Sequence, residues 1–344
     1  MNLSMLSEGD NRMAWQSIGI LGTGSYVPQR HVSNDEVAER VGVTADWIER
    51  KTQIGGRRYA ADHEATSDLA VQAAISALKD AGLSADQIDY IIISTSTPDS
   101  PQPPTACHVQ RKLGADAASC FDVNAVCSGF VYGLALARGL VAQRPGSLAL
   151  VVAADVYSRI LDFSDRRTAV LLGDGAGAAV VGAVPNGYGF VDFELGSRGD
   201  AHRLIRVEAG GSRMPSTPQT IADGGHFFRM EGRDVREFAM ENFPPALDRL
   251  CSKTQVDRLS IQHFVPHQPN GVMLSDLVER AGLSHTVTHR TLENYGNIGS
   301  GSCALTLDVA NASDGLKDGD LVLLGTFGGG MSLALGLLRW VGVA

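Results

Sequence analysis

One pattern of strands and helices occurs twice in the same order, and this repeat limits the fold of the 344-residue chain more than any other feature. Short runs of β-branched and apolar residues alternate with longer amphipathic stretches, which is typical of α/β proteins. Predicted strands cover residues 17–21, 90–94, 120–123, 148–153, 178–184, 263–265 and 321–325. Predicted helices cover residues 34–41, 67–81, 106–113, 128–143, 232–252, 270–281 and 300–312.

The second half of the chain repeats the landmarks of the first. Each half has a strand, a loop, a helix, a strand-to-helix turn rich in small residues and a closing strand. The interval from Thr95 to Cys127 in the first half is nearly the same as that from His267 to Ser300 in the second. Equal spacing of matching landmarks indicates an internal duplication. We therefore predict a short flexible extension over residues 1–16 and two related α/β halves over 17–184 and 185–344.

The composition limits which binding partners the protein can have and indicates the redox state of its cysteines. With 44% hydrophobic and 19% charged residues, the chain has the make-up of a globular protein, and its net charge is −9. Because no run of Lys or Arg is present, nucleic acid is not expected as a partner, although one small basic patch would be enough to bind an acidic carrier protein. Five scattered cysteines form no disulfide framework and no metal-binding spacing, which indicates reduced thiols.

The sequence gives no sign of a targeting or membrane segment. Residues 1–16 are polar and acidic and lack the apolar stretch of a signal peptide, and Met13 is an alternative start. We expect no apolar run to reach the roughly 18 residues that a membrane span requires. The predicted location is the cytoplasm, with no membrane partner.

Cys127 is the residue with the clearest chemical context. It lies between a short β-type run and an apolar helical stretch, so it is predicted at the first turn of a helix. Unpaired backbone N–H groups and the positive end of the helix dipole lower the pKa of a thiol there and stabilise an oxyanion. The thiol is therefore a candidate acyl carrier; an inert core cysteine is the alternative.

His267 and Asn297 supply the other groups that a condensation requires. His267 follows a predicted strand, and Asn297 lies in the second strand-to-helix turn. A neutral imidazole N–H and an amide N–H aimed at one point form an oxyanion hole for an enolate. A strand-end histidine bonded to the backbone and a left-handed turn asparagine are the alternatives. The glycines at 328–330 form either a hairpin turn or a close approach of backbone N–H groups to a thioester.

The chain resembles the β-ketoacyl-acyl-carrier-protein synthase III family of the thiolase fold, over nearly all of Ile18 to Trp340. The motifs that carry the resemblance are GTGSYVP at 22–28, DVNAVCSGF at 122–130, GDGAGA at 173–178, PHQPN at 266–270, YGN at 295–297 and FGGG at 327–330. The resemblance implies two duplicated α/β halves packed as a five-layer αβαβα sandwich. It also implies a homodimer that needs no metal or redox cofactor, since acyl-CoA and malonyl thioesters are its substrates and an acyl carrier protein is its partner.

The resemblance also assigns roles within the site. Cys127 would take the primer acyl group, with its thioester oxygen held by the backbone N–H groups of Cys127 and Gly329. His267 and Asn297 would polarise the malonyl thioester, promote its decarboxylation and stabilise the enolate that attacks the acyl-Cys. Phe327 matches an aromatic residue that lines the family's active site.

Departures from the family pattern concern substrate binding. Trp47 and Arg166 match the pair that sandwiches the adenine of coenzyme A. Lys51 and Gln53 replace an arginine and a glycine of the usual motif, and Val272 replaces an arginine often found on the carrier-docking helix. Because lysine lacks the bidentate fork of arginine, these changes leave open whether the malonyl donor is carrier protein or coenzyme A.

Gln102 aligns with an acyl-pocket position that the family contributes across the dimer. A polar group there would suit a functionalised or longer primer, whereas a solvent-facing position in the Pro-rich loop is the alternative. We predict decarboxylative Claisen condensation, in fatty-acid initiation or in a specialised polyketide-type pathway. Two rivals are a non-elongating acyltransferase that acylates an alcohol or amine, and a non-catalytic partner subunit of a ketosynthase heterodimer.

Overall fold

Two five-stranded sheets form the frame of the protein in the computed structural model, which describes residues 16–313 and 315–342. The predicted extension lies almost entirely outside the described residues. In spatial order, the first sheet contains β1 (Ile18–Tyr26), β7 (Asp174–Ala183), β6 (Ala149–Val156), β4 (Tyr90–Ser94) and β5 (Ser119–Val123). The second contains β8 (Gly189–Ser197), β14 (Ser332–Arg339), β13 (Leu321–Gly328), β11 (His263–Pro266) and β12 (Val287–Thr288).

The two sheets have the same topology. In each, the first three strands in this order pair antiparallel and the last three pair parallel. The strands of the first sheet all come from residues 18–183 and those of the second all come from 189–339. The strands of the two halves thus have the same spatial order and the same directions, as expected for the internal repeat seen in the sequence.

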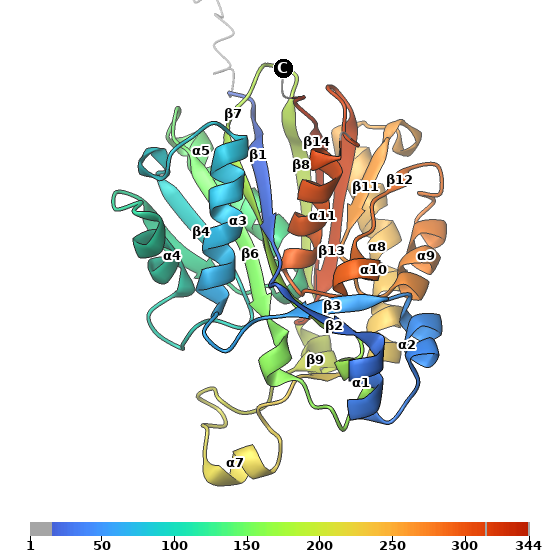
Figure 1. Ribbon diagram of the computed structural model, residues 1–344. Coiled ribbons are helices and arrows are strands. Elements are labelled where there is room, and N and C mark those ends of the chain that lie inside the picture. The colour runs from blue at the N-terminus through green and yellow to red at the C-terminus, as the bar shows by residue number, and fades with distance from the viewer. Residues whose placement is uncertain (1–15, 314, 343–344) are drawn as a thin grey trace, which may run out of the picture.

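Helices make three further layers around the sheets (Figure 1). The central helices α5 (Gly129–Gln143) and α11 (Gly301–Ala312) each contact strands of both sheets. On the outer face of the first sheet lie α3 (Thr66–Asp80) and α4 (Thr105–Leu113). On the opposite outer face, α8 (Gly232–Thr254) packs on β8 and β14, and α9 (Gly271–Arg280) packs against α8. The expected five-layer, thiolase-like α/β fold is therefore confirmed.

Most predicted elements appear within a few residues of their expected positions, and two differences are instructive. Helix α1 (Asn34–Val41) and strand β4 have the predicted bounds. The antiparallel pair β2 (Arg30–Ser33) and β3 (Gly56–Tyr59), helix α2 (Ala45–Thr52), β8 and β14 were not predicted. The glycine-rich segment expected to be a turn before β7 belongs to β7 itself. A side chain at Gly177 would lie 2.4 Å from the backbone nitrogen of Leu305 in α11, so glycine lets the helix lie directly on the strand.

The sequence was expected to contain no apolar run long enough to span a membrane. Judged by length and composition alone, this expectation was wrong. Val126–Gln143 satisfies both, but half of it is buried inside the protein. This segment contains α5, whose Phe130, Val131 and Leu134 belong to one core cluster with residues of α11 and of both sheets. Because a central-layer helix is packed on two faces, it is apolar on more than one side.

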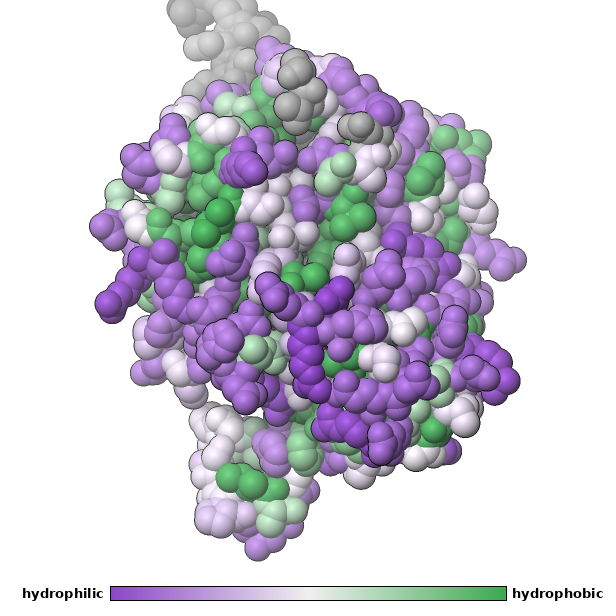
Figure 2. Space-filling model, viewed as in Figure 1, coloured by the Kyte–Doolittle hydropathy of each residue, from purple (hydrophilic) through white to green (hydrophobic). Residues whose placement is uncertain are grey.

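One excursion leaves the layered body between β8 and α8. It contains β9 (Ile205–Arg206), helix α7 (Pro218–Ala222) and β10 (Arg229–Met230), and β9 pairs antiparallel with β10 at its base. The lobe that carries α7 projects from the body (Figure 1), and Figure 2 shows apolar side chains near its tip. Through Ile205, Phe228 and Met230, the base of the excursion reaches the cavity described next.

Candidate active site

A single cavity of about 280 Å³ gathers most of the residues that the sequence singled out. Cys127, His267 and Asn297 all line it, although the first comes from one half of the chain and the other two come from the second. Phe327 lies in its wall as well. The cavity is formed where the strand-to-helix turns of the two halves meet.

Cys127 occupies a short 3-10 turn, Val126–Ser128, that runs directly into α5. Val126 has a positive φ of 48°, which is uncommon for a β-branched residue. The backbone therefore changes direction just before Cys127. Cys127 is only 8% exposed. Burial, followed by the charge of Asp155, raises the pKa of the Cys127 thiol, and its own backbone N–H only partly opposes them. The lowered pKa expected from the helix position was therefore wrong, because desolvation outweighs the helix terminus.

The glycine run at the end of β13 lies against Cys127. A side chain at Gly328 would come within 2.6 Å of the Cys127 nitrogen and 2.9 Å of its Cβ, so only glycine allows this approach. Gly329 packs against Val126, and the Ser332 hydroxyl donates to the carbonyls of Ala125 (3.0 Å) and Gly329 (3.1 Å). The run 328–330 was singled out in the sequence, with Gly329 as the expected contact, and in the structure Gly328 makes the closest approach to Cys127.

His267 is held at the end of β11 as a neutral ring. Its backbone N–H donates to Gly325 O at 2.8 Å, and the side chain meets Phe327 edge-on with ring centroids 5.6 Å apart. Burial lowers the pKa of His267 from 6.5 to about 3. The ring is therefore uncharged near neutral pH, as an N–H donor to an enolate oxygen requires.

The turn after α10 (Leu292–Tyr295) fixes Asn297 from both sides. Its backbone N–H donates to Leu171 O, and its carbonyl accepts from Gly173 N–H, both at 2.9 Å. The side-chain oxygen of Asn297 accepts from Gly299 N–H at 2.9 Å. Because that oxygen is occupied, the amide N–H₂ remains as the donor that a substrate oxygen can use. Asn297 is not the left-handed turn residue that the sequence offered as an alternative, since the positive φ (67°) belongs to the preceding Gly296.

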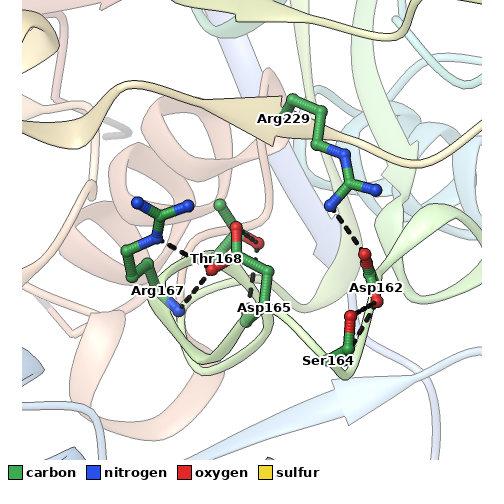
Figure 3. Close-up of polar contacts among 6 residues, drawn as sticks. All are labelled: Asp162, Ser164, Asp165, Arg167, Thr168 and Arg229. Carbon is green, nitrogen blue, oxygen red and sulfur yellow. Dashed lines mark hydrogen bonds and ion pairs between the residues drawn. The ribbon is translucent and has the colours of Figure 1, made fainter. Parts of the chain in front are cut away.

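Three basic or aromatic side chains that the sequence linked to substrate binding, Trp47, Lys51 and Arg166, line the cavity. Trp47 and Lys51 are four residues apart on α2 and so share one face of it, and the Arg166 guanidinium lies 5.6 Å from the Trp47 ring centroid. Arg166 begins the short helix α6 (Arg166–Ala169), which Asp165 caps by accepting from Arg167 N–H at 3.1 Å. Figure 3 shows this loop tied to β10, where Arg229 donates to Asp162 at 2.6 Å.

Gln53 and Val272, which depart from the family motif, are next in sequence to two residues that line the cavity, Thr52 and Met273. Gln53 caps α2 with a left-handed φ of 58°, and its side-chain oxygen accepts from Arg290 at 2.5 Å. This pair lies directly on Gly271 at the start of α9, where a Cβ would clash with both side chains. Val272, the next residue of α9, is 41% exposed. An apolar surface thus stands where the family often has an arginine.

Gln102 does not reach the cavity within its own chain. It is exposed in the loop after β4 and lines a separate shallow hollow together with Pro98 and Phe121. Its predicted place in an acyl pocket required a second subunit, and that prediction stands untested. Among the described residues, no group of three or more His, Cys, Asp or Glu side chains could hold a metal ion.

Two aromatic residues of the cavity wall were missed by sequence analysis. Tyr157, just after β6, and Phe228, just before β10, meet edge-on with ring centroids 5.5 Å apart. Tyr157 is 2% exposed and its hydroxyl is bonded to Ser96 Oγ at 2.7 Å. No sequence pattern marked either residue, because each reaches the cavity through tertiary packing.

Comparison with known proteins agrees with this geometry. The family model 3-oxoacyl-[acyl-carrier-protein (ACP)] synthase III matches residues 121–199, and the model of the C-terminal part of the same synthase matches 251–340. An acetoacetyl-CoA synthase of a Streptomyces strain is 49% identical over 93% of this chain and 98% of that protein. A β-ketoacyl-[acyl-carrier-protein] synthase III of Caldanaerobacter subterraneus is 39% identical over 94% of this chain and 97% of that protein.

Among solved structures, the priming β-ketosynthase of a polyketide biosynthetic pathway superposes with a TM-score of 0.88 at 33% identity. The match covers 95% of this chain and 98% of that one. The thiol, imidazole and amide in one cavity, the duplicated sandwich and these relatives lead to one conclusion: the chain belongs to the 3-oxoacyl-[acyl-carrier-protein] synthase III family of decarboxylative condensing enzymes.

Proposed function

We propose that this enzyme condenses a short acyl-CoA primer, acetyl-CoA in the first instance, with malonyl-CoA to give a β-ketoacyl-CoA. The observation that carries the proposal is the meeting of Cys127, His267 and Asn297 in one cavity whose wall includes the Trp47–Arg166 pair. The high identity to an acetoacetyl-CoA synthase supports this choice of substrates.

In the first half-reaction, the Cys127 sulfur attacks the thioester carbonyl of the primer. A C–S bond forms to Cys127, the C–S bond to coenzyme A breaks, and the thiol proton goes to the departing coenzyme A. Backbone N–H groups of Cys127 and Gly329 stabilise the tetrahedral oxyanion. Because the resting thiol is neutral, its proton must leave as the primer carbonyl engages it.

In the second half-reaction, the malonyl thioester oxygen accepts from His267 Nε2–H and the Asn297 amide. Cleavage of the carboxylate C–C bond releases CO₂ and leaves an enolate whose charge these donors hold. The enolate carbon attacks the acyl-Cys carbonyl, the β-ketoacyl product forms, and the Cys127 sulfur leaves and takes a proton from solvent. The cycle needs only the two thioesters and no metal or redox cofactor.

The aromatic wall favours a short primer. Tyr157 and Phe228 close part of the cavity, and the hydrogen bond of the Tyr157 hydroxyl to Ser96 restrains the first ring. A methyl group occupies less of such a cavity than an extended acyl chain. An acetyl primer therefore fits this cavity better than the longer primer that a polar side chain at Gln102 would suit.

The surface at α9 favours coenzyme A over a carrier protein as the malonyl carrier. Docking of an acidic carrier depends on basic side chains, and exposed Val272 supplies none at the position where the family often has arginine. Malonyl-carrier protein remains the alternative donor. Replacing Val272 by arginine would then raise the rate with the carrier protein and leave the rate with malonyl-CoA unchanged.

The proposal is tested by CO₂ release from malonyl-CoA or malonyl-carrier protein after a panel of acyl-CoA primers has been offered. We expect release that depends on acetyl-CoA and vanishes in Cys127→Ala. Asn297→Ala should still acylate Cys127 but lose decarboxylation by about 100-fold or more, the cost of removing one oxyanion donor. Acylation without CO₂ release from either donor in the unmodified enzyme would instead indicate the non-elongating acyltransferase.

We also propose a homodimer in which Gln102 reaches the cavity of the partner subunit. Strand β5 is the edge of the first sheet, and its Phe121 lines the same hollow as Gln102. An exposed strand edge is a ready template for pairing with a second chain. Native mass spectrometry should give a dimer, which would also remove the heterodimer partner-subunit rival, and Gln102→Ala should alter primer preference.

A further inference from the structure

A buried carboxylate that the reaction scheme does not use joins the two halves of the protein beside the catalytic cavity. Asp155, at the end of β6, is completely buried. One carboxylate oxygen accepts from Ser96 N–H at 2.8 Å and from the hydroxyls of Thr95, Ser96 and Thr97 at 3.0–3.1 Å. These donors all belong to the loop that follows β4 in the first half.

The second carboxylate oxygen reaches across to the other half of the chain. It accepts from Ser300 N–H at 2.8 Å and from Ser300 Oγ at 2.7 Å. Ser300 is the N-cap residue of α11, and its hydroxyl also donates to Ser94 O at 3.1 Å. Asp155 therefore supplies, from the first half, the acceptor for an N–H group at the positive end of a helix in the second.

The anchored serine ends the turn that carries Asn297. Only Ile298 and Gly299 separate the two residues, and Gly299 has a φ of 61°. A Cβ at Gly299 would lie 2.5 Å from the Asp155 carboxylate and 2.3 Å from the Tyr157 ring. The backbone of the Asn297 turn therefore packs directly against these two side chains. Since Gly299 N–H holds the Asn297 side-chain oxygen, a shift of Ser300 would move the amide as well.

We propose that Asp155 is a positioning residue for the condensation step, because it fixes the Asn297 turn of the second half relative to the nucleophile-bearing first half. The inference rests on the proposed role of Asn297 as a donor to the enolate. Asp155 touches neither substrate in this scheme and acts through Ser300 and Gly299. Its loss should impair the step that needs Asn297 and spare the step that needs only Cys127 and the glycine turn.

The test separates the two half-reactions in Asp155→Asn, Ser300→Ala and the double variant. Intact mass measures acetylation of Cys127 by acetyl-CoA, and CO₂ release from malonyl-CoA on the acetylated enzyme measures decarboxylation. We expect decarboxylation to fall by about 10- to 100-fold, the range known for removing a group that orients a metal ligand, while acetylation is not slowed. The double variant should be no slower than Asp155→Asn, because both changes break one linkage.

Asp308→Asn is the matched control. Asp308 lies on the same helix α11 and also accepts from the opposite half, through the hydroxyls of Thr23 (2.8 Å) and Ser25 (2.6 Å), but about two helical turns beyond Ser300. It should leave the ratio of the two half-reactions unchanged. An equal loss of both half-reactions in Asp155→Asn, or the same selective loss in Asp308→Asn, would overturn the inference.

Two further results keep the conclusions separate. If Asp155→Asn does not fold, Ser300→Ala alone decides, since it keeps the carboxylate and removes one hydroxyl. If Asn297→Ala decarboxylates malonyl-CoA normally, the proposed function of Asn297 fails and this inference fails with it. If Asn297→Ala is defective in decarboxylation while Ser300→Ala and Asp155→Asn are normal, the positioning role of Asp155 is overturned and the proposed function of Asn297 stands.

Discussion

The neutrality of His267 has a measurable cost in stability at acid pH. Its pKa is lowered by burial from 6.5 to about 3 in the folded protein, while the unfolded chain keeps the ordinary value. As the pH falls below 6.5, His267 becomes protonated in the unfolded chain. In the folded protein it stays neutral until the pH reaches about 3. Stability from this group is therefore lost as the pH falls through that window and is constant above it.

The linkage relation gives the magnitude. At pH 7.0 the unfolded histidine is mostly neutral and the penalty is a few tenths of a kcal/mol. At pH 5.0 the unfolded histidine is almost fully protonated and the folded one is not, so the penalty is about 2 kcal/mol. The His267→Gln variant keeps a hydrogen-bond donor but cannot take up this proton.

The assay is urea unfolding of the wild type and of His267→Gln at pH 7.0 and 5.0. Between these two pH values the wild type should lose about 2 kcal/mol more free energy of unfolding than the variant. Other buried groups that titrate, including His289 and Asp174, are present in both proteins and cancel in the comparison. An equal loss in both proteins would refute the argument, since it would mean that the His267 ring is not held neutral by burial.

Three further outcomes are expected. Gly299→Ala should lower the free energy of unfolding by about 3 kcal/mol in urea titration, because its Cβ would clash with Tyr157 and Asp155 at a left-handed φ. Asp155→Asn should let Cys127 react with iodoacetamide at lower pH, because the Asp155 charge raises the pKa of the thiol; a pH profile of alkylation checks it. Phe228→Ala should raise CO₂ release with hexanoyl-CoA relative to acetyl-CoA by about tenfold or more.

Local patterns in the sequence were enough to predict the kind of fold and to single out the candidate catalytic groups. The alternation of strands and helices depends on which residues are apolar and how they are spaced, so β4, α1 and the repeat of the two halves were predicted from short windows. Side-chain chemistry is equally local. A thiol before a helix, a histidine at a strand end and an asparagine in a glycine turn can each be recognised from a few neighbouring residues, and the family resemblance added their roles.

Tertiary structure decided what depends on contacts between distant residues. The direction of the Cys127 pKa shift follows from burial between two halves of the chain, which no window of sequence around it contains. Tyr157 and Phe228 become one cavity wall only because an excursion returns to the end of β6. Asp155 contacts Ser300 across 145 residues. The sequence alone thus specified which groups the protein has, while desolvation, mutual orientation and cavity shape came from packing, because they are properties of the assembled layers.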